Sequence, residues 1–135
     1  MPGTCNAVVN GAMLVAGSSD PGPIPVGTGG TLTDGRYYLT EAKAYAGASL
    51  AGFMQTQTVE ISCGGTVGQF VNQKGATEIR KTWTLNPVGT DPGFKIICSS
   101  ISNDPDLMYS SFTATPTSFT FYSATLGFSG TFTKQ

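Results

Sequence analysis

Histidine is absent from this chain of 135 residues, and charged residues of either sign are few. Without histidine, nucleophilic catalysis by Ser-His-Asp or Cys-His groups is excluded, and the commonest transition-metal ligand is missing. Because 7 basic residues stand against 8 acidic ones, the net charge is -1, and no cluster of lysine and arginine marks a surface for nucleic acid. We therefore expect a non-enzymatic protein with no cofactor, no metal and no nucleic-acid partner.

Long apolar runs are missing as well. No stretch of the chain is long and apolar enough for a transmembrane helix, which needs roughly 18 or more such residues. The apolar segment at residues 6–17 lacks a basic region before it and is interrupted by asparagine and glycine, so it does not read as a signal peptide. Low charge, Thr/Ser-rich segments and the cysteines indicate a secreted or periplasmic protein whose leader is absent from this chain, with a cytosolic protein as the alternative.

The strong helix formers glutamate, lysine, arginine and glutamine are scarce, whereas glycine, serine and threonine are abundant. This composition favours an all-β fold of short strands joined by turns. Residues 1–30 are rich in glycine and proline and predict an irregular N-terminal lead that packs across the domain or is partly mobile. Residues 31–135 are predicted to form a single β-barrel domain.

Alternation of apolar and polar residues between turn signals predicts eight strands in that domain. They fall in residues 34–45, two in 53–73, then 77–86, 94–100, 107–115, 118–124 and 127–134. Gly64-Gly65 predicts a tight hairpin, and a slip of the alternation near Glu41 predicts a bulge. A meander without helices closes into an antiparallel up-and-down barrel, which we favour, or forms a two-sheet β-sandwich.

The chain has three cysteines, Cys5, Cys63 and Cys98, so at most one internal disulfide can form. Cys63 and Cys98 fall in predicted strands in register with inward apolar residues, whereas Cys5 lies in the lead, where a covalent tie is most useful. We therefore favour Cys5 with Cys98, which leaves Cys63 as a buried free thiol. The other pairings stay open, as do three reduced cysteines in a cytosolic protein.

One face of the predicted strands is apolar and the other is mostly serine and threonine, which is typical of a sheet with one buried side. The residues assigned inward are Val67, Val71, Trp83, Leu85, Phe94, Ile96, Met108, Phe112, Phe119, Phe121, Phe128 and Phe132. An eight-stranded barrel is either filled by its own side chains or holds one small ligand. The aromatic row is thus a packed core or a pocket wall, and Gly68 and Gly130 leave gaps among the larger residues.

We predict a binding module for a small hydrophobic ligand, with a structural, cell-surface or homo-oligomeric β protein with a packed core as the alternative. The predicted ligand-binding residues are the walls Trp83, Phe112, Phe121 and Phe128, with Arg36, Tyr38 and Arg80 to orient the ligand. Glu60 and Glu78 alternate out of phase with the apolar set and are predicted on the surface. Asn103, Asp104 and Asp106 share a loop that reads as a solvated turn, with calcium binding as the alternative.

A resemblance to a known group is carried by the first barrel strand. Residues 29–40 fit the pattern Gly-Gly-x-x-x-Asp-Gly-x-Tyr-x-Leu-Thr through Gly29, Gly30, Asp34, Gly35, Tyr37 or Tyr38, Leu39 and Thr40. Together with the closing segments SSFTATPTSFTFY and FSGTFTK, this resembles small bacterial proteins of secreted or lipoprotein type, whose function is not established. The resemblance covers residues 29–135. It implies a lipocalin-like β-barrel, and it also implies that Cys5 and Cys98 form the bridging pair.

Overall fold

The computed structural model describes residues 5–102, 104 and 109–135, and it confirms an all-β protein. The strands are β1 (Val15–Asp20), β2 (Gly35–Tyr45), β3 (Met54–Ser62), β4 (Val67–Lys74), β5 (Thr77–Thr84), β6 (Lys95–Ser99), β7 (Ser111–Thr115), β8 (Ser118–Ser123) and β9 (Phe128–Lys134). All eight predicted strands are present, together with β1, which the sequence did not predict. In the part of the chain that is described, no helix could cross a membrane.

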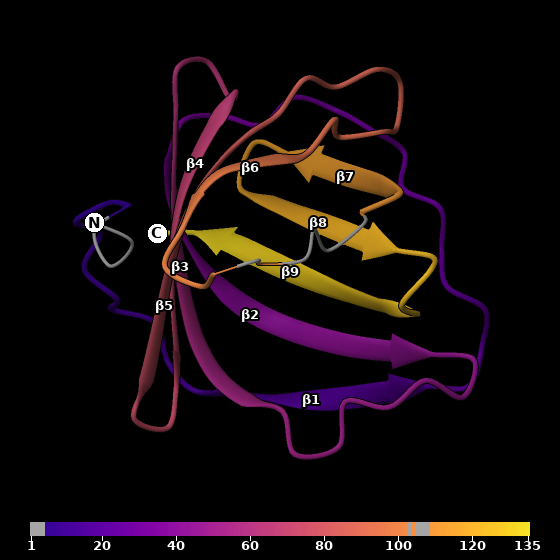
Figure 1. Ribbon diagram of the computed structural model, residues 1–135. Helices are drawn as coiled ribbons and strands as arrows, with labels where there is room; N and C mark the ends of the chain where they lie inside the picture. Colours follow the sequence, from indigo (N-terminus) through magenta and orange to yellow (C-terminus); the bar gives the residue numbers. More distant parts are fainter. Residues whose placement is uncertain (1–4, 103, 105–108) are drawn as a thin grey trace.

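All nine strands belong to one strongly curled sheet with the order β6-β5-β4-β3-β1-β2-β9-β8-β7. Figure 1 shows β3, β4 and β5 nearly edge-on, while β2, β9, β8 and β7 turn away from them to enclose the interior of a half-barrel. Because β6 and β7 end the order and no ladder joins them in the described residues, the predicted closed eight-stranded barrel is not confirmed.

Strand β7 does not pair with β6 because other backbone occupies its free edge. The Gly29 amide donates to the Phe112 carbonyl, and the Ala114 amide donates to the Gly29 carbonyl. A third bond runs from the Phe112 amide to the carbonyl of Thr90, in the β5–β6 connection. The N-terminal lead also approaches β7 closely at Gly27. Only glycine fits there, since a Cβ at residue 27 would lie 2.2 Å from the Phe112 carbonyl oxygen. Gly29 of the N-terminal lead and Thr90 of the β5–β6 connection thus cover this edge in place of a closing ladder.

Strand β1 corrects the prediction that residues 1–30 are irregular. The N-terminal half of β2 pairs with β3 as far as Tyr38, after which the two strands separate. Strand β1 fills the gap, running parallel to β2 at Gly17–Ala42 and antiparallel to β3 at Val15–Gln55. Residues 15–20 of the lead therefore belong to the sheet, and the rest of the described lead outside this strand is largely irregular.

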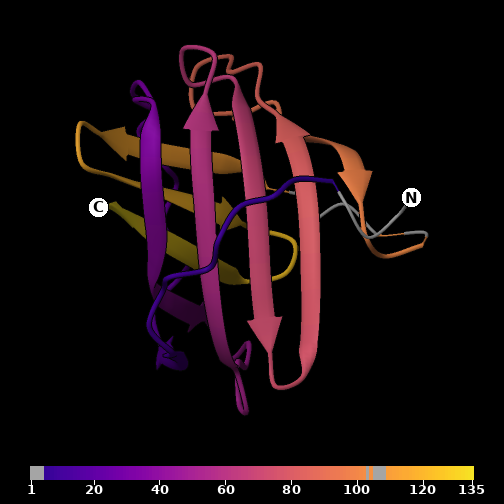
Figure 2. The same cartoon turned by 90° about the vertical axis from the view of Figure 1, so that its left-hand side faces the viewer.

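The described residues before β1 cross the outer face of β3, β4 and β5, as Figure 2 shows. Asn10 exchanges hydrogen bonds with Thr56 and Thr58 of β3, and the Asn6 side chain donates to the backbone carbonyls of Phe70 and Lys81. Val8 lies buried here, as does Val71 of β4 beneath the segment. The apolar side chains of the outer face thus gain a small core of their own.

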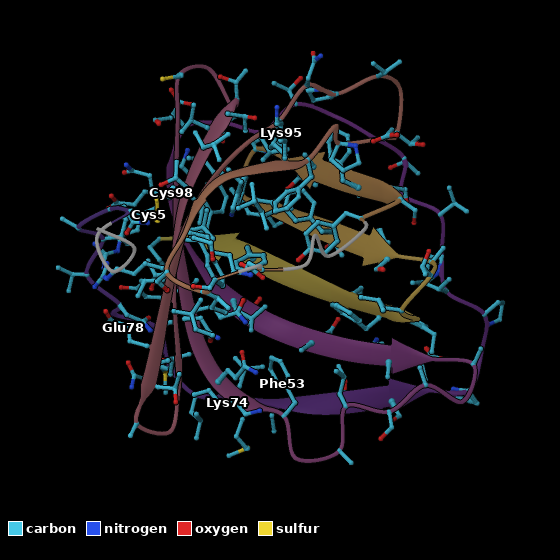
Figure 3. All side chains as sticks on the ribbon, in the orientation of Figure 1. Cys5, Phe53, Lys74, Glu78, Lys95 and Cys98 are labelled. Carbon is cyan, nitrogen blue, oxygen red and sulfur yellow. A yellow bond between two sulfur atoms is a disulfide. The ribbon has the colours of Figure 1, made fainter. Side chains whose placement is uncertain are left out.

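The predicted Cys5–Cys98 disulfide is present, with 93 residues of sequence separation, and Figure 3 shows the pair at the β6 side of the sheet. Cys98 was expected to point inward with Ile96. The register of β6 shifts at Ile97, so that Ile96 lies opposite Trp83 and Cys98 lies opposite Thr82. This bulge transfers Cys98 to the outer face, where the Thr82 hydroxyl also binds the Cys5 carbonyl.

Cys63 is free, as predicted, but it is exposed instead of buried. Strand β3 ends at Ser62, and Cys63 begins the turn into β4 with a φ of 57°, followed by Gly64 at 70° and Gly65 at 82°. The predicted hairpin at the glycine pair is therefore confirmed, and the turn comprises four residues, Cys63 to Thr66, instead of the glycine pair alone. The predicted bulge is also confirmed, since the β2–β9 register shifts between Leu39 and Glu41.

Candidate functional site

A pocket of about 240 Å³ lies inside the curl of the sheet. It is lined by Leu39, Ala42, Leu50, Phe53, Gln55, Gln57, Phe70, Asn72, Ile79, Lys81, Trp83, Phe94, Tyr109, Phe121, Phe128, Ser129, Gly130 and Phe132. Most of these side chains are apolar or aromatic, with a few polar groups among them. A concave, mainly apolar site with a small number of polar groups is typical of a small-molecule binding site.

Small residues on β2 and β9 leave this space open. Ala42 and Gly130 are directly opposite each other in the β2–β9 ladder, and both line the pocket. A Cβ on Gly130 would meet Leu39 at 3.5 Å and Phe132 at 3.7 Å, which is ordinary contact. Gly68 is different, because its missing side chain is replaced by the Trp83 ring, whose atoms come within 2.3 Å of the Cβ position. Of the two predicted gaps, Trp83 fills one and the other faces the pocket.

The inner end of the pocket is aromatic. Trp83 lies 5.8 Å from Phe121 between ring centroids and 5.2 Å from Phe94, and Tyr109 lies 4.7 Å from Phe121. Phe94 precedes β6 and Tyr109 precedes β7, and their rings meet edge to face at 5.1 Å. Rings therefore connect the two ends of the sheet order, which no backbone ladder joins among the described residues, and they form a surface on which a flat apolar molecule can stack.

The outer end of the pocket is lined by half-buried residues. They are Leu50, Phe53, Gln55, Gln57, Ile79 and Phe128. Figure 3 places Phe53 and Lys74 near one end of the molecule and Lys95 near the other. At the aromatic end Trp83 and Phe121 are buried, although Phe94 and Tyr109 are half-buried. Because all six residues of the outer group are half-buried, we place the mouth of the pocket at the Phe53 end.

Asn72, which is 6% exposed, lies opposite Gln57 and Ile79 of this outer group. Its Oδ1 atom is buried and has no hydrogen-bond partner among the described residues. Gln57, opposite Asn72 in the β3–β4 ladder, instead donates from Nε2 to Oε1 of Gln55 at 3.0 Å. A buried acceptor without a donor is unfavourable, and native proteins contain few of them.

Lys81 contributes an ammonium group to the pocket wall, and that group is already paired. Its Nζ atom lies 2.9 Å from Oδ2 of Asp104, which also accepts a hydrogen bond from the Ser99 hydroxyl at 2.7 Å. Burial by itself would raise the pKa of Asp104, but the hydrogen bonds from Lys81 and Ser99 and the charge of Lys81 hold that pKa below its usual 3.8. The prediction of a solvated turn is wrong for Asp104, and Asn103 and Asp106 lie outside the described residues.

Three of the predicted ligand-binding residues, Trp83, Phe121 and Phe128, line the pocket. Phe112 does not, since its side chain is fully buried in the core beside it. That core consists of Leu32, Tyr37, Leu39, Val59, Ile61, Trp83, Leu85, Phe112, Phe119, Phe121 and Phe132. The aromatic row of the C-terminal strands therefore divides between core and pocket wall.

The predicted polar contacts, Arg36, Tyr38 and Arg80, lie on the opposite face of the sheet. Arg80 donates to the Val8 carbonyl at 2.7 Å, and Arg36 donates to the Val9 carbonyl, both in the N-terminal segment. Tyr38 stands against Gly11, where a Cβ would lie 2.4 Å from its hydroxyl oxygen. Strand alternation explains the placement, because Tyr37 and Leu39, the neighbours of Tyr38, point into the core. The geometry gives these three residues a role in fastening the lead, not in orienting a ligand in this pocket.

The inward assignment was also wrong for Val71. Its neighbours Phe70 and Asn72 line the pocket, so Val71 faces outward and is buried under the lead. Met108, another residue assigned inward, lies outside the described residues. The pocket side of β4 is identified by its register with β5, which puts Phe70 opposite Lys81 and Gly68 opposite Trp83, and alternation in the sequence does not define it.

Comparisons with protein-family models, curated proteins and solved structures gave no match. The resemblance to small secreted bacterial proteins therefore stays a prediction. Among the described residues, no group of histidine, cysteine, aspartate or glutamate is arranged to hold a metal ion. The candidate site therefore rests on the geometry of the pocket alone.

Proposed function

We propose that this protein is a binding module that holds one small, largely apolar molecule in the pocket between β2, β9 and β3–β5. The observation that carries the proposal is a pocket of about 240 Å³ with an aromatic inner end and space above Ala42 and Gly130. An engineered apolar cavity of about 150 Å³ accommodates benzene, so this pocket suits a bicyclic molecule of about ten to twelve non-hydrogen atoms.

Binding fits the charged groups better than catalysis does. The ammonium group in the pocket wall, Lys81, is engaged by Asp104. Glu60 and Glu78 pair with Arg36 and Arg80 on the outer face, far from the aromatic inner end. The proposed role is therefore to carry or sequester a molecule without changing it.

We further propose that the protein works in an oxidising compartment, as a secreted or periplasmic protein of lipocalin-like type. The Cys5–Cys98 disulfide supports this location, because such bonds form and persist outside the reducing cytosol. Alkylation of the protein immediately on lysis of its own host would show one reactive thiol if the disulfide exists there and three if it does not.

Isothermal titration of the folded protein with 2-naphthol tests the binding proposal. We expect one saturable site with a Kd between about 10 μM and 1 mM, which is the range for a ligand of this size. The variant Gly130→Val, which places two methyl groups toward the pocket, should weaken binding at least tenfold. Thr131→Val, the adjacent residue on the opposite face of β9, is the matched control and should bind like the parent protein.

Either of two results would count against the pocket as a binding site. If naphthalene-sized compounds do not bind at all, the structural or oligomeric alternative becomes the better explanation. If Gly130→Val and Thr131→Val bind equally well, the molecule binds elsewhere on the surface.

A further inference from the structure

The pocket changes character along its length, and the strand register defines the order. From the inner end toward the mouth, β4 and β5 present Gly68 with Trp83, then Phe70 with Lys81, then Asn72 with Ile79. Gln57 of β3 lies opposite Asn72, on the same level. The buried Trp83 ring therefore lies farthest from the mouth along these strands, and the polar side chains Asn72 and Gln57 lie closer to it.

Of these polar side chains, Asn72 has hydrogen-bonding capacity left unused. Asn72 lines the pocket and its Oδ1 atom is buried without a partner in the described part of the chain, whereas Nε2 of Gln57 donates to Oε1 of Gln55. A donor brought in by a ligand would satisfy this atom, and a ligand without a donor would leave it unsatisfied. Asn72 can therefore distinguish molecules that are otherwise the same in shape.

The charge of the pocket indicates that the ligand is neutral. Lys81 is the cationic residue in the pocket wall. Its Nζ atom lies 2.9 Å from the Asp104 carboxylate, which neutralises it and whose side chain is only 7% exposed. An anionic ligand would have to share Lys81 with Asp104 and lose its own hydration in a largely apolar site. A neutral molecule avoids both costs.

We propose that the ligand is a neutral, flat bicyclic molecule that carries a hydroxyl or N–H donor at one end, and that Asn72 selects it by accepting that hydrogen bond. This inference rests on the proposed function of the pocket and names the chemistry of its ligand. The ring system lies against Trp83, Phe94 and Phe121, and the donor points back toward the mouth, where the Asn72 side chain lies.

Four probes of one ring system separate these contributions. 2-Naphthol offers a donor, 2-methoxynaphthalene only an acceptor, naphthalene neither, and 2-naphthoate a negative charge. We expect 2-naphthol to bind about tenfold more tightly than naphthalene, a difference of about 1.4 kcal/mol. The methoxy compound should resemble naphthalene, and 2-naphthoate should bind more weakly than 2-naphthol.

The variant Asn72→Leu tests the residue, because leucine has nearly the shape of asparagine without its polar atoms. We expect naphthalene and 2-naphthol to bind this variant equally, and we expect the ligand-free variant to have a higher Tm than the parent protein, since the unsatisfied acceptor is gone. Gln57→Leu is the matched control on the neighbouring strand, and it should keep the tenfold preference for 2-naphthol. Asn72→Ala gives a second measure of the lost preference.

The outcomes separate this inference from the proposed function. If naphthalene binds in the pocket but 2-naphthol gains nothing over it, the binding module stands and the role of Asn72 is overturned. A preference for 2-naphthol that survives in Asn72→Leu, or equal binding of the methoxy compound, also overturns it. Tightest binding by 2-naphthoate would show that Lys81 selects the ligand. If no probe binds at the Gly130 site, the proposed function itself fails.

Discussion

Lys81 on β5 and Asp104, which follows β6, form a buried ion pair with 2.9 Å between Nζ and Oδ2. The pair links β5, in the wall of the pocket, to the segment that follows β6. Ser99, at the end of β6, donates a further hydrogen bond to Oδ2 of Asp104. Because both side chains are nearly removed from solvent, their interaction is screened little by salt.

We predict that this pair makes the protein sensitive to acid. The hydrogen bonds and charge described above keep the pKa of Asp104 below its usual 3.8 in the folded protein. A lowered pKa means that the carboxylate stabilises the fold fully above the unfolded value, and that this contribution is lost as the pH falls below 3.8 through the folded value. Urea unfolding at a series of pH values should show the loss, and Asp104→Asn should remove that part of the pH dependence. An unchanged slope in the variant would contradict the prediction.

At neutral pH, Asp104→Asn should lower the free energy of unfolding by about 3 kcal/mol, because the substitution leaves the Lys81 charge buried without a counter-charge. Urea unfolding at pH 7 measures the change. Glu78→Gln is the control, since Glu78 is half exposed in its pair with Arg80 and such surface pairs contribute at most about 1 kcal/mol. Equal effects of the two substitutions would show that the Lys81–Asp104 pair is not buried in solution.

Alanine at two glycines should have opposite effects. Gly68→Ala puts a methyl group where the Trp83 ring already lies, so it should destabilise the protein by about 1 to 3 kcal/mol. Gly130→Ala meets only ordinary contacts and removes the entropic cost of glycine in a strand, so it should be neutral or stabilising by about 0.5 to 1 kcal/mol. Thermal unfolding of both variants checks this. Similar losses would mean that the space at Gly130 is not open.

Loss of the disulfide should release the N-terminal segment and destabilise the fold. The bond closes a loop spanning 93 residues of separation, for which the chain-entropy model gives about 4 to 5 kcal/mol, and measured losses run from about 2 kcal/mol upward. Cys98→Ser should therefore lower Tm and speed hydrogen exchange in residues 5–11. Cys63→Ser, which removes an exposed free thiol, should change the free energy of unfolding by less than about 0.5 kcal/mol. A stable Cys98→Ser protein with a protected lead would show that the hydrogen bonds of Asn6, Asn10 and Arg80 suffice.

Much of the fold could be predicted from the sequence, since alternation and turn residues act locally. They located eight strands, the hairpin at Gly64-Gly65 and the bulge before Glu41, and composition favoured strands over helices. The pairing of Cys5 with Cys98 was also predictable. The strands, the hairpin and the bulge depend on neighbours a few residues apart, so a single sequence contains the information that defines them. The cysteine pair, 93 residues apart, was instead inferred from the number and placement of the three cysteines.

Tertiary structure alone decided the rest. Strand β1 has no strong pattern and exists because β2 and β3 separate and leave their edges to be paired. Alternation distinguishes the two faces of a strand but not which one faces the pocket, and the lead buries apolar residues such as Val71 on the outer face. The bulge at Ile97 places Cys98 on the outer face of the sheet. Hydrogen bonds with Gly29 and Thr90 occupy the edge of β7, so that β7 does not close the barrel. Asp104 forms its ion pair with Lys81. Each depends on contacts between distant segments, whose free energy no local pattern encodes.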